Sequence, residues 1–232
     1  VAAGACNSIY TTTSGSYDWN HRSSTPATLG RIHSIAFVDS LNVLAVGNYG
    51  ECVRSSDGGV SWNIVEMNSK VDQNAVDFSP EGIGLSVGQG GTIIRWTDKS
   101  SVFTEVSTGV AAYIYGLRFI DEDNGIAYAQ DGLVLTTSNG GDSWVKHQRV
   151  MPVSMLGIFI KDLTTATAVG INGSVSRTTN GGISWTSKNY VETAQLESVT
   201  FYDDSVGMAV GHTFDAITFQ PCLLYTSPSP RD

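Results

Sequence analysis

A short turn sequence, repeated at a fixed spacing, constrains the fold of this chain more than any other feature. Residues 55–62 read Ser-Ser-Asp-Gly-Gly-Val-Ser-Trp, and closely similar segments stand at 137–144 and 178–185. The last two segments are 41 residues apart and the first two are twice that, with an eroded copy halfway between them and a weaker copy ending at Trp19. A fixed period of this length predicts one supersecondary unit per repeat.

Two further landmarks keep the same register. A Phe ends a short apolar run in each period, an Asp follows three of these Phe residues by two positions, and a small residue ends the next run. Each period therefore predicts four short strands, the pattern of a four-stranded antiparallel β-propeller blade. The residues are Phe37, Phe78, Phe119, Phe159 and Phe201; Asp39, Asp121 and Asp203; and Gly47, Gly88, Ala129, Gly170 and Gly211.

The amino-acid composition agrees with an all-β fold, and the net charge limits the classes of partner that the chain is expected to bind. Gly is abundant at 25 residues, and the apolar runs are short and end in turn formers. The 13 Lys and Arg against 22 Asp and Glu give a net charge of −9, which disfavours nucleic acid and anionic lipid and favours a cationic partner. Three Cys and four His lack metal-ligand spacing, so we expect no metal and no cofactor.

The repeated turn, which we call the box, has a structural explanation. Its Asp or Asn side chain is expected to accept backbone N–H groups a few residues on, while the following glycines supply positive φ angles. Its Trp is expected to pack between neighbouring blades. The box residues are Ser55, Asp57, Gly59 and Trp62; Asp98 and Phe103 in the eroded copy; Asn139, Gly141 and Trp144; and Asn180, Gly182 and Trp185.

These boxes resemble the Asp-box, or BNR, repeat of sialidases, other glycosidases, sortilin-type receptors and photosystem II assembly factors. The resemblance covers about residues 1–211. The Asn-Gly-Gly or Asp-Gly-Gly turn and the Gly-x-Val/Ile strand before it are most similar to the Ycf48/Hcf136 type. That resemblance implies a seven-bladed scaffold that binds photosystem II subunits in the thylakoid lumen; outside that type, it implies a secreted or extracytoplasmic protein.

The repeats predict a single β-propeller domain over residues 1–220. We place blades at about 31–70, 72–108, 113–149 and 154–191, with partial blades at 1–25 and 195–220. Seven such blades would need about 287 residues, so we expect an incomplete seven-bladed ring. A five-bladed ring closed by strands from residues 5–19 is the alternative. Residues 221–232 lack a box and hold half of the six prolines, so we expect no blade strand there and suspect a non-native tail.

The leading interpretation is a non-catalytic scaffold that binds a protein partner, with membrane contact only through that partner. By the resemblance, loops between the second and third strands of each blade gather on one face of a propeller, where ligands commonly bind. The candidate binding residues on these loops are Asn48, Tyr49, Gln89, Gln130, Asp131, Asn172 and His212. Polar, variable loop tips also occur without any binding role.

A fragment of a secreted sialidase or glycoside hydrolase is the alternative, together with a carbohydrate-binding or receptor ectodomain that takes a glycan. Such hydrolases need paired acidic residues, or a Tyr nucleophile with a Glu and an arginine cluster, and no complete catalytic set is visible. Arg54, Arg95 and Arg177 each stand three residues before a box acid or its Asn replacement. They either contact an anion or repeat an exposed position that was copied with the blade.

Overall fold

A computed structural model describes residues 2–3, 8–12, 18–23, 30–97, 102–147, 153–190, 194–204, 206–214 and 219–226. Side chains are described in these ranges except at residues 2, 3, 23, 214 and 219–226. The chain divides into two compact units. Unit 1 comprises Val1–Gly125 and Thr137–Val145, and unit 2 comprises Ile126–Thr136 and Lys146–Asp232.

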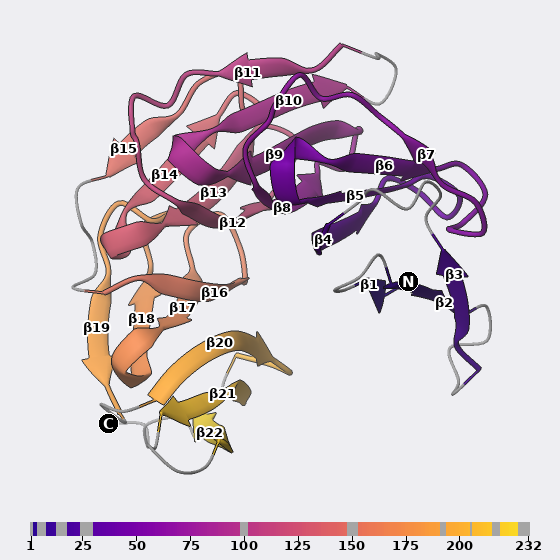
Figure 1. Cartoon of the computed structure of the whole chain (residues 1–232). Coiled ribbons are helices and arrows are strands. Elements are labelled where there is room, and N and C mark those ends of the chain that lie inside the picture. Colours follow the sequence, from indigo (N-terminus) through magenta and orange to yellow (C-terminus); the bar gives the residue numbers. More distant parts are fainter. Residues whose placement is uncertain are drawn as a thin grey trace. The chain divides into compact units, whose positions relative to one another are not determined.

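The regular structure is a succession of sheets, each formed by strands consecutive in the sequence (Figure 1). In the sheet of residues 32–64, for example, strands consecutive in the sequence pair antiparallel. The first sheets are β1 (Ala2–Ala3), β2 (Ser8–Thr11) and β3 (Asn20–Ser23); β4 (Ile32–Phe37), β5 (Val43–Gly47), β6 (Cys52–Ser55) and β7 (Asn63–Ile64); and β8 (Gln73–Phe78), β9 (Ile83–Gly88), β10 (Ile93–Thr97) and β11 (Thr104–Val106).

The later sheets repeat this plan. A single turn of 3-10 helix stands between the second and third strands of each four-stranded sheet. The strands are β12 (Ile114–Phe119), β13 (Asn124–Ala129), β14 (Val134–Ser138) and β15 (Val145–His147); β16 (Met155–Ile160), β17 (Ala166–Gly170), β18 (Ser174–Thr178) and β19 (Thr186–Asn189); and β20 (Ala194–Phe201), β21 (Gly207–Phe214) and β22 (Phe219–Thr226). The turns are η1 (Asn48–Gly50), η2 (Gln89–Gly91), η3 (Gln130–Gly132) and η4 (Ile171–Gly173).

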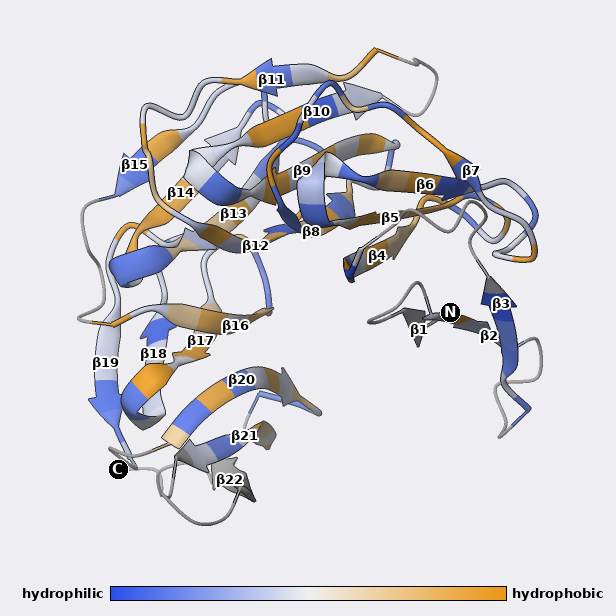
Figure 2. Cartoon of the chain, viewed as in Figure 1, coloured by the Kyte–Doolittle hydropathy of each residue, from blue (hydrophilic) through white to orange (hydrophobic). Residues whose placement is uncertain are grey.

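The core lies around the second strands. Every residue of β5 and of β17 is buried, and Figure 2 shows β17 largely in the hydrophobic colour while β19 is pale or blue. Within unit 1, Val43 and Ala45 belong to a cluster that contains Ile9 of β2, whereas Leu44 and Val46 belong to a cluster that contains residues of β8 and β10. Because successive strand residues point to opposite faces, β5 buries both faces between neighbouring sheets.

The boxes form tight turns before the fourth strands. In the first copy, Asp57 Oδ1 accepts the backbone N–H groups of Val60 at 3.0 Å and Ser61 at 2.9 Å, and Ser55 Oγ accepts the N–H of Gly59 at 2.8 Å. Trp62 is only 4% exposed, and its Nε1 donates to the carbonyl of Gly59 at 3.1 Å. The expected hydrogen bonds are therefore present, and the box carboxylate serves the turn.

The Asn-containing boxes use the same bonds. Asn139 Oδ1 and Asn180 Oδ1 each accept a backbone N–H four residues on at 3.0 Å, from Ser143 and Ser184. An amide oxygen thus replaces the carboxylate as acceptor. In the eroded copy, Asp98 lies outside the described residues, while Phe103 packs on Trp96 with ring centroids 5.2 Å apart.

Two sequence expectations are wrong in detail. Ile160, and not Phe159, ends β16 and pairs with the first residue of the next strand, as Phe37 and Phe201 do in their sheets. A one-residue slip moves a strand side chain to the opposite face, so Phe159 leaves the column that its spacing suggested. The expectation that residues 221–232 form no blade strand is also wrong for residues 221–226, which belong to β22 and pair with β21. Residues 227–232 lie outside the described residues.

Candidate functional site

The turns that join second to third strands are fixed in pairs, and in unit 1 Asp72 is the link. The backbone N–H of Tyr49 in η1 donates to Asp72 Oδ1 at 2.9 Å. The backbone carbonyl of Asp72 accepts the N–H of Gln89, the first residue of η2, at 3.0 Å. One residue just before β8 therefore holds the turn of its own sheet with its backbone and the turn of the preceding sheet with its side chain.

Unit 2 repeats this arrangement with a different residue. The N–H of Asp131 in η3 donates to Ser154 Oγ at 3.0 Å, and the N–H of Ile171 in η4 donates to the Ser154 carbonyl at 3.3 Å. We call η1 with η2, and η3 with η4, the paired turns. In each pair, bonds to a single residue fix both turns before any partner arrives.

The middle residue of every paired turn has the left-handed backbone conformation. The residues are Tyr49 (φ 58°), Gly90 (φ 72°), Asp131 (φ 60°) and Asn172 (φ 57°). Gly, Asp and Asn tolerate this region, whereas a bulky side chain there is an outlier. Tyr49 keeps this conformation with 70% of its residue surface exposed, so no burial of its ring compensates the strain.

The third residue of each turn is a glycine, and in η1 and η2 the backbone of the next connection passes directly over it. A Cβ on Gly50 would collide with the carbonyl oxygen of Ser69, and a Cβ on Gly91 would collide with that of Val110. These turns expose their second residue and bury the third, while the first residue is exposed in η2 and η3 and half-buried in η1 and η4. The candidates Asn48, Tyr49, Gln89, Gln130, Asp131 and Asn172 all lie in the first two positions of these turns.

His212 differs from the other candidates. The sequence argument placed it in a loop, but it lies within β21, which continues to Phe214 and pairs His212 with Gln195 and Pro221. Its Nδ1 is 3.3 Å from Glu197 Oε1. The loop assignment is therefore wrong for this residue, because the last sheet extends its second strand through the position where the others form η turns.

A bulge in first strands adds groups that the sequence argument missed. The register shifts between Ile32 and Ser34 and between Gln73 and Ala75, so His33 and Asn74 are the extra residues. His33 Nδ1 lies 3.2 Å from the carbonyl of Gln73, and Asn74 Nδ2 donates to the carbonyl of Ile114 at 2.7 Å. Each bulge residue thus contacts the start of the next first strand, and no common residue type marks the position.

Two of the three repeated arginines have protein acceptors of their own. Arg54 Nη2 donates to Asn42 Oδ1 at 3.2 Å within one sheet. Arg95 Nε donates to the carbonyl of Gly140 at 2.8 Å and lies 3.1 Å from Asp142 Oδ1. Arg177 is exposed and lines a groove in unit 2. The arginines share a strand position but have different surroundings.

Over the described ranges, no group of three or more His, Cys, Asp or Glu side chains is arranged to hold a metal ion. The same ranges contain no helix that is long and apolar enough to cross a membrane. Cys52 is a buried free thiol, and burial raises its pKa. Cys6 and the side chain of Cys222 are not among the described groups.

Comparison of the structure with solved structures finds strong matches. YCF48 from Cyanidioschyzon merolae superposes with a TM-score of 0.71 at 15% identity, covering 95% of this chain and 76% of that one. This chain has a β-propeller fold. YCF48 bound to a D1 peptide also gives a TM-score of 0.71 at 15% identity, over 96% of this chain and 72% of that one. The WD40 β-propeller domain of Doa1 gives 0.64 at 15% identity, over 82% and 66%.

Sequence comparisons add no relatives to this propeller. No family model matches the sequence. No curated protein matches it either. The likeness to YCF48 and to the Doa1 domain is therefore one of fold, with the sequence expectation of a propeller of four-stranded antiparallel blades confirmed.

Proposed function

We propose that this propeller is a non-catalytic scaffold that binds a protein partner at its paired turns. The observation that carries the proposal is Tyr49. Its three counterparts are Gly90, Asp131 and Asn172, which accommodate the left-handed conformation, whereas Tyr49 holds an exposed aromatic ring there. Strained residues that the surrounding structure over-determines are typical of functional sites.

The chemistry of this surface suits a polypeptide. Tyr is enriched at protein interfaces because its ring supplies apolar area while its hydroxyl can bond. Gln89, the first residue of η2, is exposed and offers an amide donor and acceptor, whereas Oδ1 of Asn48 is buried. Because the hydrogen bonds of Asp72 already order η1 and η2, binding would cost little loop entropy.

The finer proposal is that the partner is a photosystem II subunit and that the protein acts as an assembly factor in the thylakoid lumen. The box resemblance supports this, as does the likeness to a YCF48 structure with a bound D1 peptide. A glycan ligand, a fragment of a glycoside hydrolase and a receptor ectodomain are the alternatives, and no described residue set favours one of them.

Titration of the D1 peptide against the full chain tests the finer proposal. We expect saturable binding that Tyr49→Asn weakens about tenfold, the loss typical of removing an aromatic anchor. Tyr202→Asn is the matched control, because Tyr202 is also exposed but lies in the turn between the first and second strands of its sheet. No saturable binding, or equal binding by both variants, would contradict a D1-like partner at this site.

The broader proposal needs a second experiment. A photo-crosslinking phenylalanine analogue at position 49, and the same analogue at position 41 in the exposed turn between β4 and β5, would be compared in extracts of the native host. We expect one defined protein adduct at position 49 and none at position 41. Adducts of equal pattern at the two positions would mean that the paired turns are not the binding surface.

A further inference from the structure

Four Asn–Gly dipeptides occur in the chain, and all of them lie in described segments. In such a dipeptide, the backbone nitrogen of the glycine can attack the side-chain carbonyl carbon of the asparagine, because glycine has no side chain to hinder the approach. The ring closes only if the asparagine rotates about ψ, so the turn that holds the dipeptide must open first. The dipeptides are Asn124-Gly125, Asn139-Gly140, Asn172-Gly173 and Asn180-Gly181.

The box asparagine Asn139 is held on both sides of this reaction. Its Oδ1 accepts the hydroxyl of Thr137 at 2.9 Å and the N–H of Ser143 at 3.0 Å, and its Nδ2 donates to Ser143 Oγ at 2.8 Å. The attacking group, the N–H of Gly140, donates to the carbonyl of Asp123 at 2.9 Å. Opening this turn therefore breaks bonds of both the attacking nitrogen and the attacked amide.

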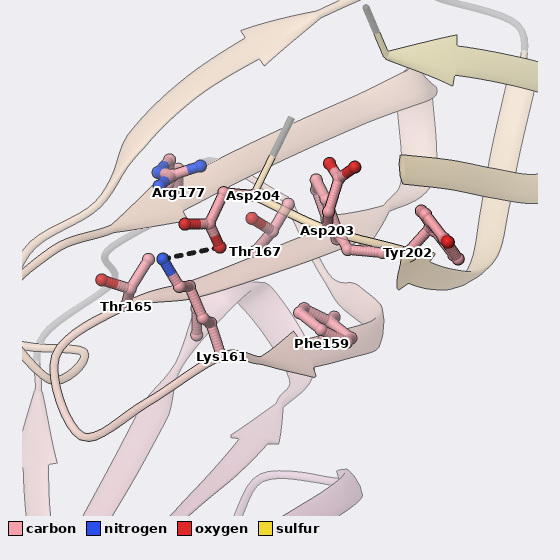
Figure 3. Close-up of a pocket in the computed structure, with 10 residues that line it drawn as sticks. Phe159, Lys161, Thr165, Thr167, Arg177, Tyr202, Asp203 and Asp204 are labelled. Atoms are coloured by element: carbon pink, nitrogen blue, oxygen red, sulfur yellow. Dashed lines mark ion pairs between the residues drawn. The ribbon is translucent and has the colours of Figure 1, made fainter. Parts of the chain in front are cut away.

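The last box holds Asn180 in the same way. The side-chain amide of Asn180 makes the corresponding three hydrogen bonds at 2.9 to 3.0 Å, and the N–H of Gly181 donates to the carbonyl of Thr164 at 2.8 Å. Figure 3 shows Lys161 of that same turn, with its Nζ 2.8 Å from Asp204 Oδ1. The acceptor of the Gly181 N–H is thus itself in a turn that an ion pair restrains.

Asn124 is held by a carboxylate. Its Nδ2 donates to Oδ1 and Oδ2 of Asp121 at 2.9 and 3.0 Å, and its backbone N–H donates to Asp121 Oδ1 at 2.8 Å. Gly125 is buried in β13. Rotation of Asn124 about ψ would therefore break these bonds and displace a buried strand residue.

Asn172, in η4, lacks such restraints. It is exposed, and in the part of the chain that the structure describes it makes no hydrogen bond outside its own turn. The N–H of Gly173 likewise has no acceptor beyond η4 among those residues. The bond that anchors η4, from the Ile171 N–H to the Ser154 carbonyl, is long at 3.3 Å. The Gly173 carbonyl accepts the N–H of Tyr190 at 3.1 Å, but this oxygen takes no part in the ring closure. Few bonds therefore oppose the opening of this turn.

The difference from the other paired turns lies at position 195. In η1 and η3, a side chain 23 positions after the middle residue accepts that residue's N–H: the carboxylate of Asp72 at 2.9 Å and the hydroxyl of Ser154 at 3.0 Å. The corresponding residue for η4 is Gln195. Its carbonyl oxygen lies against a glycine of the next strand, as those of Asp72 and Ser154 do, so the backbone positions correspond. Its side chain makes no hydrogen bond to Asn172, so η4 lacks this restraint.

We propose that Asn172 is the deamidation site of the folded chain, and that the missing bond from position 195 allows the reaction. The nitrogen of Gly173 bonds to Cγ of Asn172, the Cγ–Nδ2 bond breaks, and the proton of the attacking N–H leaves with the side-chain nitrogen as ammonia. Water then adds to either carbonyl of the resulting succinimide and opens the ring. The products are aspartate and isoaspartate, and water is the co-reactant.

The two products differ in how they fit the turn. Aspartate retains the left-handed conformation, because Asp131 already has φ 60° in η3 where Asn172 has φ 57° in η4. Isoaspartate inserts a methylene group into the backbone, so η4 cannot keep its present path. Either product adds a negative charge at an exposed turn of a chain whose net charge is −9. Both changes occur whether or not the paired turns bind a partner.

Peptide mapping by mass spectrometry tests the site. The full chain is incubated at neutral pH in heavy-oxygen water and digested in ordinary water, so that only deamidation during the incubation carries the heavy isotope. We expect Asn172 to react at least about tenfold faster than the other Asn–Gly sites, because each hydrogen bond that must open lowers the reactive population. In chain unfolded by guanidinium, the sites should react at similar rates, since the dipeptide is the same.

Substitutions at position 195 test the cause. Gln195→Asp and Gln195→Ser supply the acceptors that Asp72 and Ser154 supply to their turns. Each should slow the deamidation of Asn172 about fivefold, the effect of one added hydrogen bond. Gln195→Ala is the matched control and should leave the rate unchanged, because the Gln195 side chain makes no hydrogen bond to Asn172.

Three results would overturn the proposal, each obtained with chain whose far-UV circular dichroism is unaltered before the incubation. The first is an equal rate at Asn172 and at the box asparagines in the folded chain. The second is a tenfold faster rate at Asn172 that persists in guanidinium, which would place the cause in the local sequence. The third is an unchanged rate at Asn172 in both the Gln195→Asp and the Gln195→Ser chains.

Discussion

The carboxylate of Asp72 holds the backbone N–H of Tyr49 at 2.9 Å and thereby fixes a strained turn to the strand of the next sheet. The two residues are 23 positions apart, so the contact exists only once two sheets have packed. Asp72 is consequently a positioning residue for the proposed binding surface, and its removal should affect both stability and the presentation of the Tyr49 ring.

Asp72→Ala should destabilise the chain by about 1 kcal/mol, the typical net contribution of a hydrogen bond. Asp72→Asn should cost less, because its amide oxygen can still accept the Tyr49 N–H. Urea unfolding of the two variants checks this. Equal losses for Ala and Asn would mean that the charge of Asp72, and not the acceptor, is what matters.

Tyr49→Asn should stabilise the chain by about 1 kcal/mol, since Asn is tolerated in the left-handed region and Asn172 already stands in the same conformation. The exposed control Tyr202→Asn should stay within about 0.5 kcal/mol of the parent. Thermal melts of both variants give the comparison. A loss of stability on Tyr49→Asn would show that the ring has intramolecular contacts that outweigh the strain.

The architecture was predictable because the sequence signals of each blade are close together in the chain and recur in every blade. The small residue at the end of the second strand, the turn glycine and the box side chains fall within residues 47–62 in the first repeat, so a single sequence shows them. The positions of Asn48, Tyr49, Gln89 and Asp131 in exposed turns followed from the same register.

Contacts between sheets were not predictable in this way. Asp72 and Ser154 each accept a backbone N–H from a turn of the preceding sheet, but they are different residue types. The bulge residues His33 and Asn74 also differ in type. Phe159 shows the opposite error. Its residue type predicted that it would end its strand as Phe37 does, but Ile160 has that position. Backbone geometry recurs in this chain where side-chain identity does not.

Acid should destabilise the chain through two exposed turn carboxylates. Hydrogen bonds from the Ser61 side chain and N–H lower the pKa of Asp57 to about 2, and those from the Thr164 side chain and N–H lower the pKa of Asp162 to about 2. Unfolded Asp has a pKa of about 3.9, so their stabilisation is present above about pH 4 and is lost as pH falls toward 2.

The double variant Asp57→Asn with Asp162→Asn tests this pH dependence. Its melting temperature should fall less than that of the parent between about pH 5 and pH 2.5, because the amide acceptor does not titrate. Glu66→Gln, which removes an exposed carboxylate elsewhere, should retain the parent's slope. A parental slope in the double variant would place the acid sensitivity in other groups.

The box tryptophans should not be equivalent. Nε1 of Trp62 and of Trp185 donates to a glycine carbonyl at 3.1 and 3.0 Å, whereas Nε1 of Trp144 is buried with no acceptor among the described residues. Replacement by Phe removes a bonded donor in the first two cases and an unsatisfied one in the third. Trp144→Phe should therefore cost about 1–2 kcal/mol less than Trp62→Phe in urea unfolding. Equal costs would indicate that ring packing alone decides.

The repeated arginines should separate into structural and exposed members. Arg95→Gln should destabilise the chain by about 1–2 kcal/mol, because it loses a bond to the Gly140 carbonyl and an ion pair with Asp142. Arg177→Gln, at the same strand position over the open groove, should stay within about 0.5 kcal/mol of the parent. Urea unfolding of the two variants measures this difference. If neither substitution changed the stability, the alternative that these arginines contact an anion would be favoured. Hydrolysis of sialoside test substrates, which we expect to be absent, would then be measured next.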